Sequence, residues 1–168
     1  MADKKPTAAD ILKLIKEKEV KFVDVRFTDP QGKWQHVTFD LSMVDEDFLD
    51  NGTMFDGSSI AGWKAINESD MLLKPDLDTA VIDPFFAQTT LILICDVLEP
   101  MTGQTYSRCP RSIAKAAEIY VNTSGVGDTT YFGPEAEFFV FDDVRFDVAM
   151  NKAFYYVDSK EGAYNTGT

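Results

Sequence analysis

The amino-acid sequence predicts an α+β fold, in which a small first domain is followed by the beginning of a second. Segments with helical spacing of apolar residues lie beside segments in which apolar residues alternate or run on without a break. Hydrophobic residues make up 45% and charged residues 26% of the 168 residues, which is ordinary for a globular protein. The run 99–103, Glu-Pro-Met-Thr-Gly, interrupts the elements and indicates a domain boundary. We therefore predict an N-terminal helix at 1–17, a small domain at 18–102 and the start of a larger domain at 103–168.

The first domain is expected to open with a helix and a β-hairpin. Thr7 is a candidate N-cap, and the apolar stripe that follows it is Ile11, Leu12, Leu14 and Ile15. Residues 20–27 alternate as a half-buried strand does, and 29–32 combine Pro and Gly as a tight turn does. Residues 33–39 would be the returning strand.

The remainder of the first domain is predicted to hold a second helix, a loop and three strands. Residues 41–50 have helical spacing, and Asn51-Gly52 suits a helix C-terminus. Two short strands at 71–75 and 79–82 would be joined by a turn at 76–78. Residues 89–98 are more continuously apolar, which is typical of a central strand.

In the second domain, Pro110 suits the first turn of a helix that ends at Ser124-Gly125. The residues expected on its buried side are Ile113, Ala116, Ala117, Tyr120 and Val121. A long strand-rich stretch is expected at 129–146, with interruptions at 133–134 and 142–143.

Composition and charge exclude several classes of partner and site. The net charge of −12, without any run of Lys and Arg, argues against binding to nucleic acid or to an anionic membrane. We expect no signal peptide and no membrane span, and hence a cytoplasmic protein. The two cysteines form no disulfide framework, and Cys95 is expected to be a small buried residue. The single His36 lies in a strand-like stretch, which disfavours a zinc site.

The pair Glu135 and Glu137 carries the first candidate chemistry. Residues two apart in a strand share a face, so both carboxylates would project together from apolar surroundings. Two such carboxylates are costly unless a cation neutralises them or one is protonated. Carboxylate oxygens without His or Cys favour Mg²⁺ or Mn²⁺. The alternative is a strand edge at which two glutamates meet water.

The tetrapeptide Asp56-Gly57-Ser58-Ser59 is the second candidate site, because large apolar residues frame it: Met54, Phe55, Ile60 and Trp63. A loop with such neighbours is expected to be packed and its polar groups to be held in place. The alternative for Asp56 is a simple turn-forming residue. Trp63 and Asp70 are candidates for a subunit junction; core packing is the alternative for Trp63, and anchoring the start of a strand is the alternative for Asp70.

These motifs resemble the N-terminal portion of bacterial-type glutamine synthetase. The resemblance includes Phe-Asp-Gly-Ser-Ser at 55–59 and Glu-Ser-Asp at 68–70, and it extends over most of the chain. The other matching segments are 20–29, 80–85, 109–114 and 132–139. The family's chain is considerably longer than this one.

The resemblance implies a β-grasp N-terminal domain, followed by the start of a catalytic domain built on an antiparallel sheet. In the family, the glutamates that match Glu135 and Glu137 are ligands to two divalent metals. The aspartate that matches Asp56 reaches the neighbouring subunit's active site, where it helps to bind ammonium and takes its proton. Ser59 is expected to support that loop by hydrogen bonding. No phosphate-binding glycine motif is present, so residues that bind ATP are expected mostly beyond Thr168.

The function implied is ligation of ammonia to the side-chain carboxylate of glutamate, through γ-glutamyl phosphate, with ATP as substrate. The family assembles as a dodecamer of two stacked six-membered rings. The 168-residue chain by itself is expected to be inactive. Two alternatives remain: a non-catalytic assembly or sensing module, and a γ-glutamylpolyamine synthetase, against which the complete Asp-Gly-Ser-Ser loop argues.

Overall fold

The computed structural model describes residues 5–64 and 69–165, so Glu68 of the acidic cluster lies outside the described residues. The chain divides into two compact units, Met1–Thr129 and Thr130–Thr168, which are described separately. No helix among the described residues has the length and apolar character needed to cross a bilayer.

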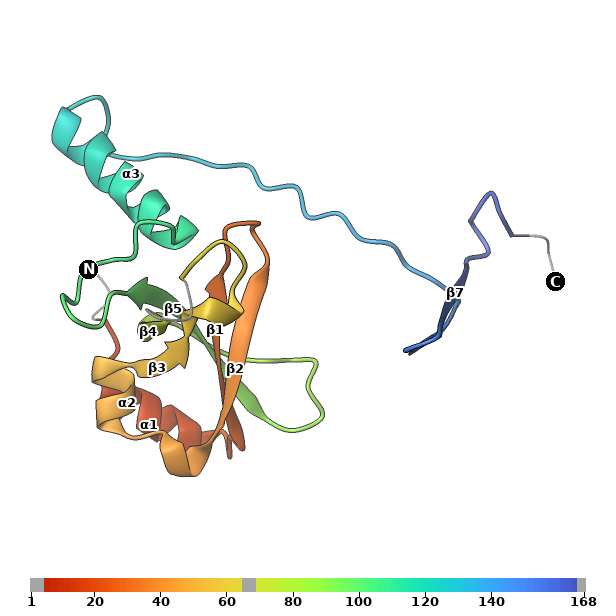
Figure 1. The fold of residues 1–168 in the computed structure, drawn as a ribbon, viewed down its shortest axis with the longest axis horizontal. Helices are drawn as coiled ribbons and strands as arrows, with labels where there is room; N and C mark the ends of the chain where they lie inside the picture. Colours follow the sequence, from red (N-terminus) through yellow and green to blue (C-terminus); the bar gives the residue numbers. More distant parts are fainter. Residues whose placement is uncertain (1–4, 65–68, 166–168) are drawn as a thin grey trace. The chain divides into compact units, whose positions relative to one another are not determined.

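Within the described part of the first unit, five strands form one mixed sheet in the order β2-β1-β5-β4-β3 (Figure 1). The strands are β1 (Phe22–Thr28), β2 (Trp34–Asp40), β3 (Thr53–Asp56), β4 (Asp70–Ile82) and β5 (Thr90–Leu98). The helices are α1 (Ala8–Glu17), α2 (Glu46–Asn51) and α3 (Pro110–Ser124), with short 3₁₀ turns η1 (Leu41–Met43) and η2 (Gly57–Ser59). Among the strands that the structure describes, β1 and β5 are the one pair that runs in parallel. The predicted α+β class and the central position of β5 are confirmed.

The apolar core lies between the sheet and the neighbouring helices α1 and α2. Thr7 caps α1 as predicted, because its side chain accepts from the Asp10 amide while the Asp10 carboxylate accepts from the Thr7 amide. The core residues include Ile11, Ile15, Val23, Val25, Phe27, Leu49, Met71, Leu73, Leu91, Leu93 and Val97. Cys95 is fully buried among them, and burial raises the pKa of its thiol, which confirms a packing role.

On the other side of β1, Asp24 is fully buried among polar partners. Its carboxylate accepts hydrogen bonds from Arg26 Nε (2.8 Å) and Thr38 Oγ1 (2.7 Å), and it lies 2.8 Å from His36 Nδ1. Burial is the largest single influence and acts to raise the pKa of Asp24. The hydrogen bonds from Arg26, His36 and Thr38 outweigh it and hold the pKa below the ordinary value. A buried carboxylate with these partners ties β1 to β2.

The predicted helix at 41–50 is interrupted. The turn η1 ends at Met43, and α2 begins at Glu46, because the Asp45 carboxylate accepts from the Phe48 amide (2.8 Å) and caps a new helix. Gly52 follows α2 as predicted, with φ +89°.

The prediction of two short strands joined by a turn at 76–78 is wrong. Strand β4 runs without a break from Asp70 to Ile82, and its register with β5 shifts between Asp76 and Val81. The Thr79 hydroxyl explains the continuity, since it accepts from the Ile94 amide (2.8 Å) and donates to the Asp76 carbonyl (2.6 Å). A side chain thus replaces ladder hydrogen bonds at the irregular position.

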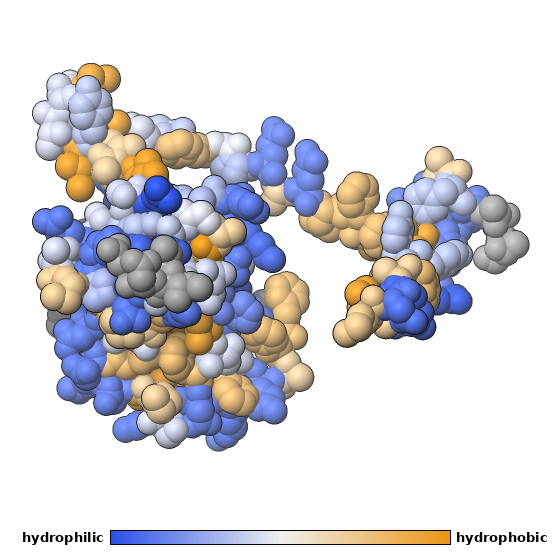
Figure 2. Space-filling model, in the orientation of Figure 1, coloured by the Kyte–Doolittle hydropathy of each residue, from blue (hydrophilic) through white to orange (hydrophobic). Residues whose placement is uncertain are grey.

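Helix α3 has the predicted bounds, but its expected buried side is wrong. Ile113 is 58% and Tyr120 70% exposed, and Ser112 is the one buried residue of the described helix. Figure 2 shows apolar atoms on the surface of this helix. Packing of an apolar stripe therefore does not attach α3 to the sheet.

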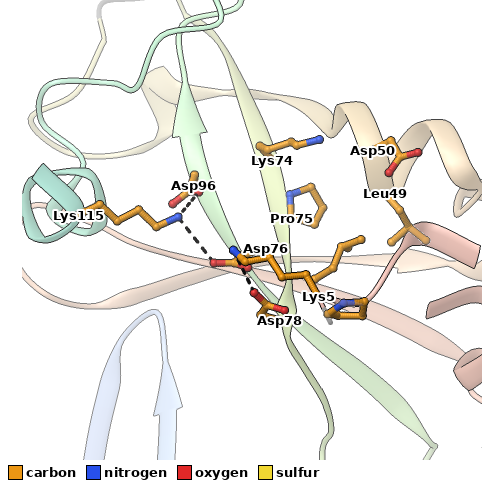
Figure 3. Close-up of a pocket in the computed structure, with 11 residues that line it drawn as sticks. Lys5, Leu49, Asp50, Lys74, Pro75, Asp76, Asp78, Asp96 and Lys115 are labelled. Atoms are coloured by element: carbon orange, nitrogen blue, oxygen red, sulfur yellow. Dashed lines mark hydrogen bonds and ion pairs between the residues drawn. The ribbon is translucent and has the colours of Figure 1, made fainter. Parts of the chain in front are cut away.

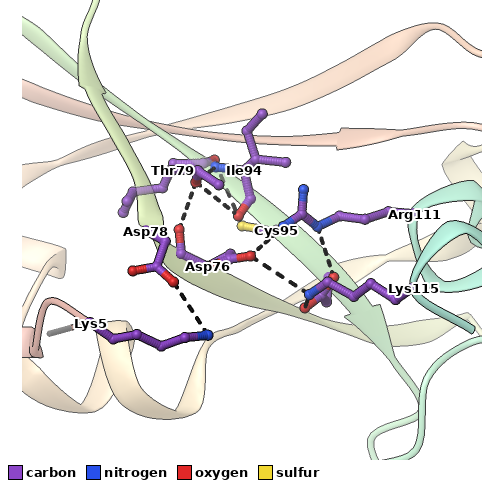
Figure 4. Close-up of polar contacts among 10 residues, drawn as sticks. Lys5, Asp76, Asp78, Thr79, Ile94, Cys95, Arg111 and Lys115 are labelled. Atoms are coloured by element: carbon purple, nitrogen blue, oxygen red, sulfur yellow. Dashed lines mark hydrogen bonds and ion pairs between the residues drawn. The ribbon is translucent and has the colours of Figure 1, made fainter. Parts of the chain in front are cut away.

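Charged side chains attach α3 to the sheet instead (Figure 4). Arg111 Nε lies 2.9 Å from Asp96 Oδ1, and a guanidinium Nη2 pairs with Asp76. Lys115 Nζ lies 2.6 Å from Asp96 Oδ2 and 3.6 Å from Asp76 Oδ2. We call these four residues the α3 ion cluster. Its side chains are only 17–41% exposed, so water screens them incompletely.

An open pocket of about 300 Å³ lies beside the ion cluster (Figure 3). Its lining includes three lysines and four aspartates: Lys5, Lys74, Lys115, Asp50, Asp76, Asp78 and Asp96. Lys5 pairs with Asp78 (3.3 Å), and Lys115, Asp76 and Asp96 belong to the cluster. Most of these charges therefore pair with one another within the protein.

The second unit contains one antiparallel hairpin, β6 (Asp143–Ala149) with β7 (Lys152–Asp158), among its described residues. The prediction of strand from 129 onwards is wrong for 129–142, which hold no helix or strand. An extended segment becomes a strand only when a neighbour pairs its backbone groups. Within 129–146, only the part from Asp143 onwards, which begins β6, is paired in the described residues.

Gly52→Ala is expected to destabilise the first unit. A Cβ at this position would overlap the Leu73 carbonyl oxygen and lie 3.1 Å from Lys74 Cα, and the backbone has φ +89°. We expect a loss of about 2–3 kcal/mol in the free energy of unfolding, measured by urea denaturation. Gly32→Ala is the matched control, since Gly32 also has positive φ (+84°) but open space around it. Equal losses in the two variants would contradict the close approach.

Arg111→Met is expected to loosen α3, because Asp76 and Asp96 would then share only Lys115. We expect faster amide hydrogen exchange in α3 and a loss of about 1–2 kcal/mol that shrinks with added salt. Lys13→Met is the control, since it breaks an exposed pair with Glu17 (3.6 Å) and should change stability by less than about 0.5 kcal/mol. Unchanged exchange in α3 would show that the ion cluster does not hold the helix.

Candidate functional site

Asp56 lies at the end of β3, an edge strand that the sequence analysis had assigned to a loop. Strand β3 pairs antiparallel with β4, so that Phe55 faces Met71 and Asp56 faces Asp70. The 3₁₀ turn η2 follows directly. Its first amide, Gly57 N, donates to the Ser69 carbonyl (2.7 Å), and Ile60 N donates back to the Gly57 carbonyl (3.2 Å). The candidate loop therefore begins directly at the end of a hydrogen-bonded strand.

Gly57 is buried against the core beneath this loop. A Cβ at Gly57 would overlap the fully buried side chain of Met71, at 2.7 Å from its Cγ, and would lie 3.0 Å from the Ser69 carbonyl oxygen. Only glycine lets the backbone approach this closely. The missing Cβ of Gly57 therefore allows the backbone of the motif to pack directly against Met71 of β4.

The Asp56 carboxylate is exposed, and its two geometrically defined hydrogen bonds come from Ser58. Asp56 Oδ1 accepts from the Ser58 hydroxyl (2.6 Å) and from the Ser58 amide (2.8 Å). The Ser58 hydroxyl, then its amide and, least, the Ser69 hydroxyl hold the pKa of Asp56 below its usual value. The carboxylate is therefore anionic at neutral pH.

The support of this loop by a Ser59 hydrogen bond remains a prediction, and the residue that holds Asp56 itself is Ser58. The Ser59 side chain is exposed, and within the described residues it makes no hydrogen bond to Asp56. The reason is geometric: in a tight turn, an aspartate reaches the amide and hydroxyl two residues ahead, which here belong to Ser58. A catalytic role of Ser59 remains a prediction.

Trp63 closes the far end of the loop within the core. It is 6% exposed, and its ring lies 5.5 Å from Phe27, 6.1 Å from Phe55 and 5.4 Å from Tyr106, between centroids. Arg108 adds a hydrogen bond to the neighbouring Gly62 carbonyl (2.7 Å). This position corresponds to the packing alternative for Trp63.

Asp70 is exposed at the first position of β4, directly opposite Asp56. It starts the strand, as the structural alternative proposed. Its role at a subunit junction stays a prediction.

Glu135 and Glu137 lie in the second unit, in the segment that forms no strand, and both are exposed. The shared face that a strand would create is therefore absent from this structure. In the part of the chain that the structure describes, no three His, Cys, Asp or Glu side chains gather as a metal site. The pair stays a prediction as metal ligands.

Two models of one family match this chain in order. The model described as glutamine synthetase, beta-Grasp domain, matches residues 19–100, and the one described as glutamine synthetase, catalytic domain, matches 107–167. Residues 19–100 of the first unit thus match a β-grasp domain, whereas the part of this unit from 107 onwards, which includes α3, matches the catalytic-domain model. The boundaries 17/18 and 102/103 remain predictions.

Curated relatives and solved structures agree with the family models. Glutamine synthetase from Bradyrhizobium diazoefficiens is 65% identical over 162 residues, which are 96% of this chain and 34% of the relative. Glutamine synthetase from Azospirillum brasilense is 64% identical over 156 residues, or 93% of this chain and 33% of the relative. The solved Plasmodium falciparum glutamine synthetase matches with a TM-score of 0.68 at 25% identity, over 93% of this chain and 30% of that one.

The chain spans about a third of the length of these curated relatives. Its two matched segments carry the Asp56 loop and the Glu135/Glu137 pair respectively. The chain therefore belongs to the glutamine synthetase family and corresponds to the N-terminal part of that family's protein.

Proposed function

We propose that this chain is the N-terminal part of an ATP-dependent glutamate–ammonia ligase. In this reaction, the glutamate side-chain carboxylate is phosphorylated to γ-glutamyl phosphate. Ammonia then forms the new C–N bond as the C–O bond to phosphate breaks. The observation that best supports the proposal is the Asp56 carboxylate, which is exposed, anionic and held on a loop packed against the core.

Asp56 suits two tasks in this reaction. Its negative charge would attract an ammonium ion, and its oxygen could accept the proton that ammonium must lose before it attacks. The loop below it restricts the carboxylate to one orientation, which reduces the entropy lost when the ion binds. The pKa of Asp56 lies below the ordinary aspartate value of 3.8, so the carboxylate is negatively charged at every pH above that value. The negative charge favours binding of the ammonium ion.

We further propose that Glu135 and Glu137 hold Mg²⁺ or Mn²⁺. Both side chains are exposed, and neither pairs with Lys or Arg within the described residues, so their oxygens are available to a hard cation. A bound ion would offset charge on the phosphoryl oxygens of ATP and of the acyl phosphate. Two carboxylates cannot complete two octahedral shells, so further ligands must come from elsewhere.

The proposed assembly is a homo-oligomer, a dodecamer of two stacked six-membered rings, in the cytoplasm, with glutamate, ammonium and ATP as substrates. Asp56 lies at the end of an edge strand and faces solvent, where a neighbouring subunit could approach it. A loop offered to the next subunit requires a head-to-tail contact, and such contacts close into rings. The charge of −12 disfavours nucleic acid and anionic membranes as partners.

In the full-length protein, Asp56→Ala is expected to lower kcat/KM for ammonium about 10²- to 10³-fold, since the cation site and the proton acceptor are lost together. Steady-state glutamine formation measures the effect. Asp40→Asn is the matched control, since Asp40 accepts from the Ser42 amide (2.9 Å) in a similar turn away from the loop. A full-length wild-type protein that used putrescine in preference to ammonium would support the polyamine alternative instead.

The isolated 168-residue chain is expected to show no γ-glutamyl transfer, because the candidate metal pair lacks the ligands of two complete shells. A γ-glutamyl hydroxamate assay with Mg²⁺ and with Mn²⁺ measures this directly, with the full-length protein as the positive control. Turnover by the isolated chain would contradict the proposed division of the site between this segment and the remainder.

A further inference from the structure

The two hydrogen bonds of defined geometry on Asp56 go to one oxygen and come from one residue, Ser58, while the Ser69 hydroxyl is a weaker donor to the same carboxylate. Ser58 donates both its hydroxyl (2.6 Å) and its amide (2.8 Å) to Oδ1. Neither of these bonds involves Oδ2. When two hydrogen bonds fix one oxygen of a carboxylate, the direction in which its second oxygen points is also defined.

The position of Ser58 is itself determined on both sides. Gly57 is pressed against Met71 and donates to the Ser69 carbonyl (2.7 Å). Ile60 is 8% exposed and closes the turn with its amide on the Gly57 carbonyl (3.2 Å). The backbone on both sides of Ser58 is therefore held in place. The Ser58 hydroxyl acts as a fixed hydrogen-bond donor to Asp56.

Among the described residues, no ion pair neutralises the charge of Asp56. From β4, the group that faces it is Asp70, which carries the same charge, and the Ser69 hydroxyl is neutral. Neutral donors thus stabilise the anion and leave its charge available to a ligand.

We propose that Ser58, and not Ser59, is the positioning residue for Asp56: it holds Oδ1 and so sets the direction in which the carboxylate meets the ammonium ion. This inference rests on the proposed function, since it concerns the same site. Ser58 would not touch the reacting nitrogen, but would act through the direction and protonation state of Asp56. Both consequences can be measured.

The first experiment is a carboxyl NMR titration of Asp56 in the 168-residue chain, which does not depend on activity. Ser58→Ala should raise the pKa of Asp56 towards the ordinary value of 3.8, because its strongest hydrogen bond is lost. Ser58→Thr keeps a hydroxyl and should keep the lowered pKa. Ser59→Ala should leave the pKa of Asp56 unchanged.

Ser42→Ala is the matched control, because Ser42 stabilises the Asp40 anion in the same way. It should raise the pKa of Asp40 and leave that of Asp56 as it is. Amide spectra of each variant establish that the fold is retained. A pKa of Asp56 that rises in Ser59→Ala but not in Ser58→Ala would overturn the assignment.

The second experiment uses the full-length protein. Ser58→Ala should raise KM for ammonium about tenfold, leave KM for glutamate and ATP unchanged, and move the acid limb of kcat/KM for ammonium to higher pH. The direction follows because a higher pKa means that Asp56 loses its charge earlier as pH falls. Ser58→Thr should restore both values.

The two experiments separate the possible failures. A wild-type full-length protein that forms no glutamine would refute the proposed function, while the NMR titration would still decide which serine holds Asp56. A titration as expected, combined with an unchanged KM for ammonium and an unchanged acid limb, would refute the positioning role in an otherwise active enzyme.

Discussion

The pairing of β3 with β4 is the constraint on which the candidate site depends. It sets Phe55 against Met71 and ends at Asp56, and the buried Met71 side chain then forms the surface on which Gly57 rests. Glycine fits this close contact because it has no Cβ. The turn η2 begins at Gly57 and brings Ser58 back to the Asp56 carboxylate. The direction of a solvent-exposed side chain is thus decided by packing in the core below it.

Two aspartates of the first unit show opposite uses of a carboxylate. Asp24 is fully buried and bound by Arg26, His36 and Thr38. Its charge is therefore compensated within the protein, and its hydrogen bonds connect β1 to β2. Asp56 is exposed and held by neutral donors, so its charge stays available. Both have a lowered pKa, so the shift alone does not identify a functional residue. The nature of the partners is what distinguishes the two carboxylates.

Helix α3 is attached to the sheet through its charged side. Arg111 and Lys115 are one turn apart and therefore reach the same side, where Asp76 and Asp96 come from adjacent strands. The helix is held at this charged side, and Ile113 and Tyr120 remain exposed. Helical periodicity predicted the helix correctly but the attached side wrongly, because periodicity does not report which face has a partner.

The sequence by itself determined the local elements and the chemistry of the motifs. The Thr7 cap, the turn at 29–32, the helix from Pro110 and the central apolar strand all follow from short-range preferences, and each is present. The tertiary structure alone decided what depends on distant partners. Thr79 makes β4 continuous through Ile94, Met71 packs against Gly57 beneath Asp56, and 129–142 hold no strand. Hydrogen bonds and packing contacts between segments far apart in the chain leave no mark in local composition, which is why these features could only be found in three dimensions.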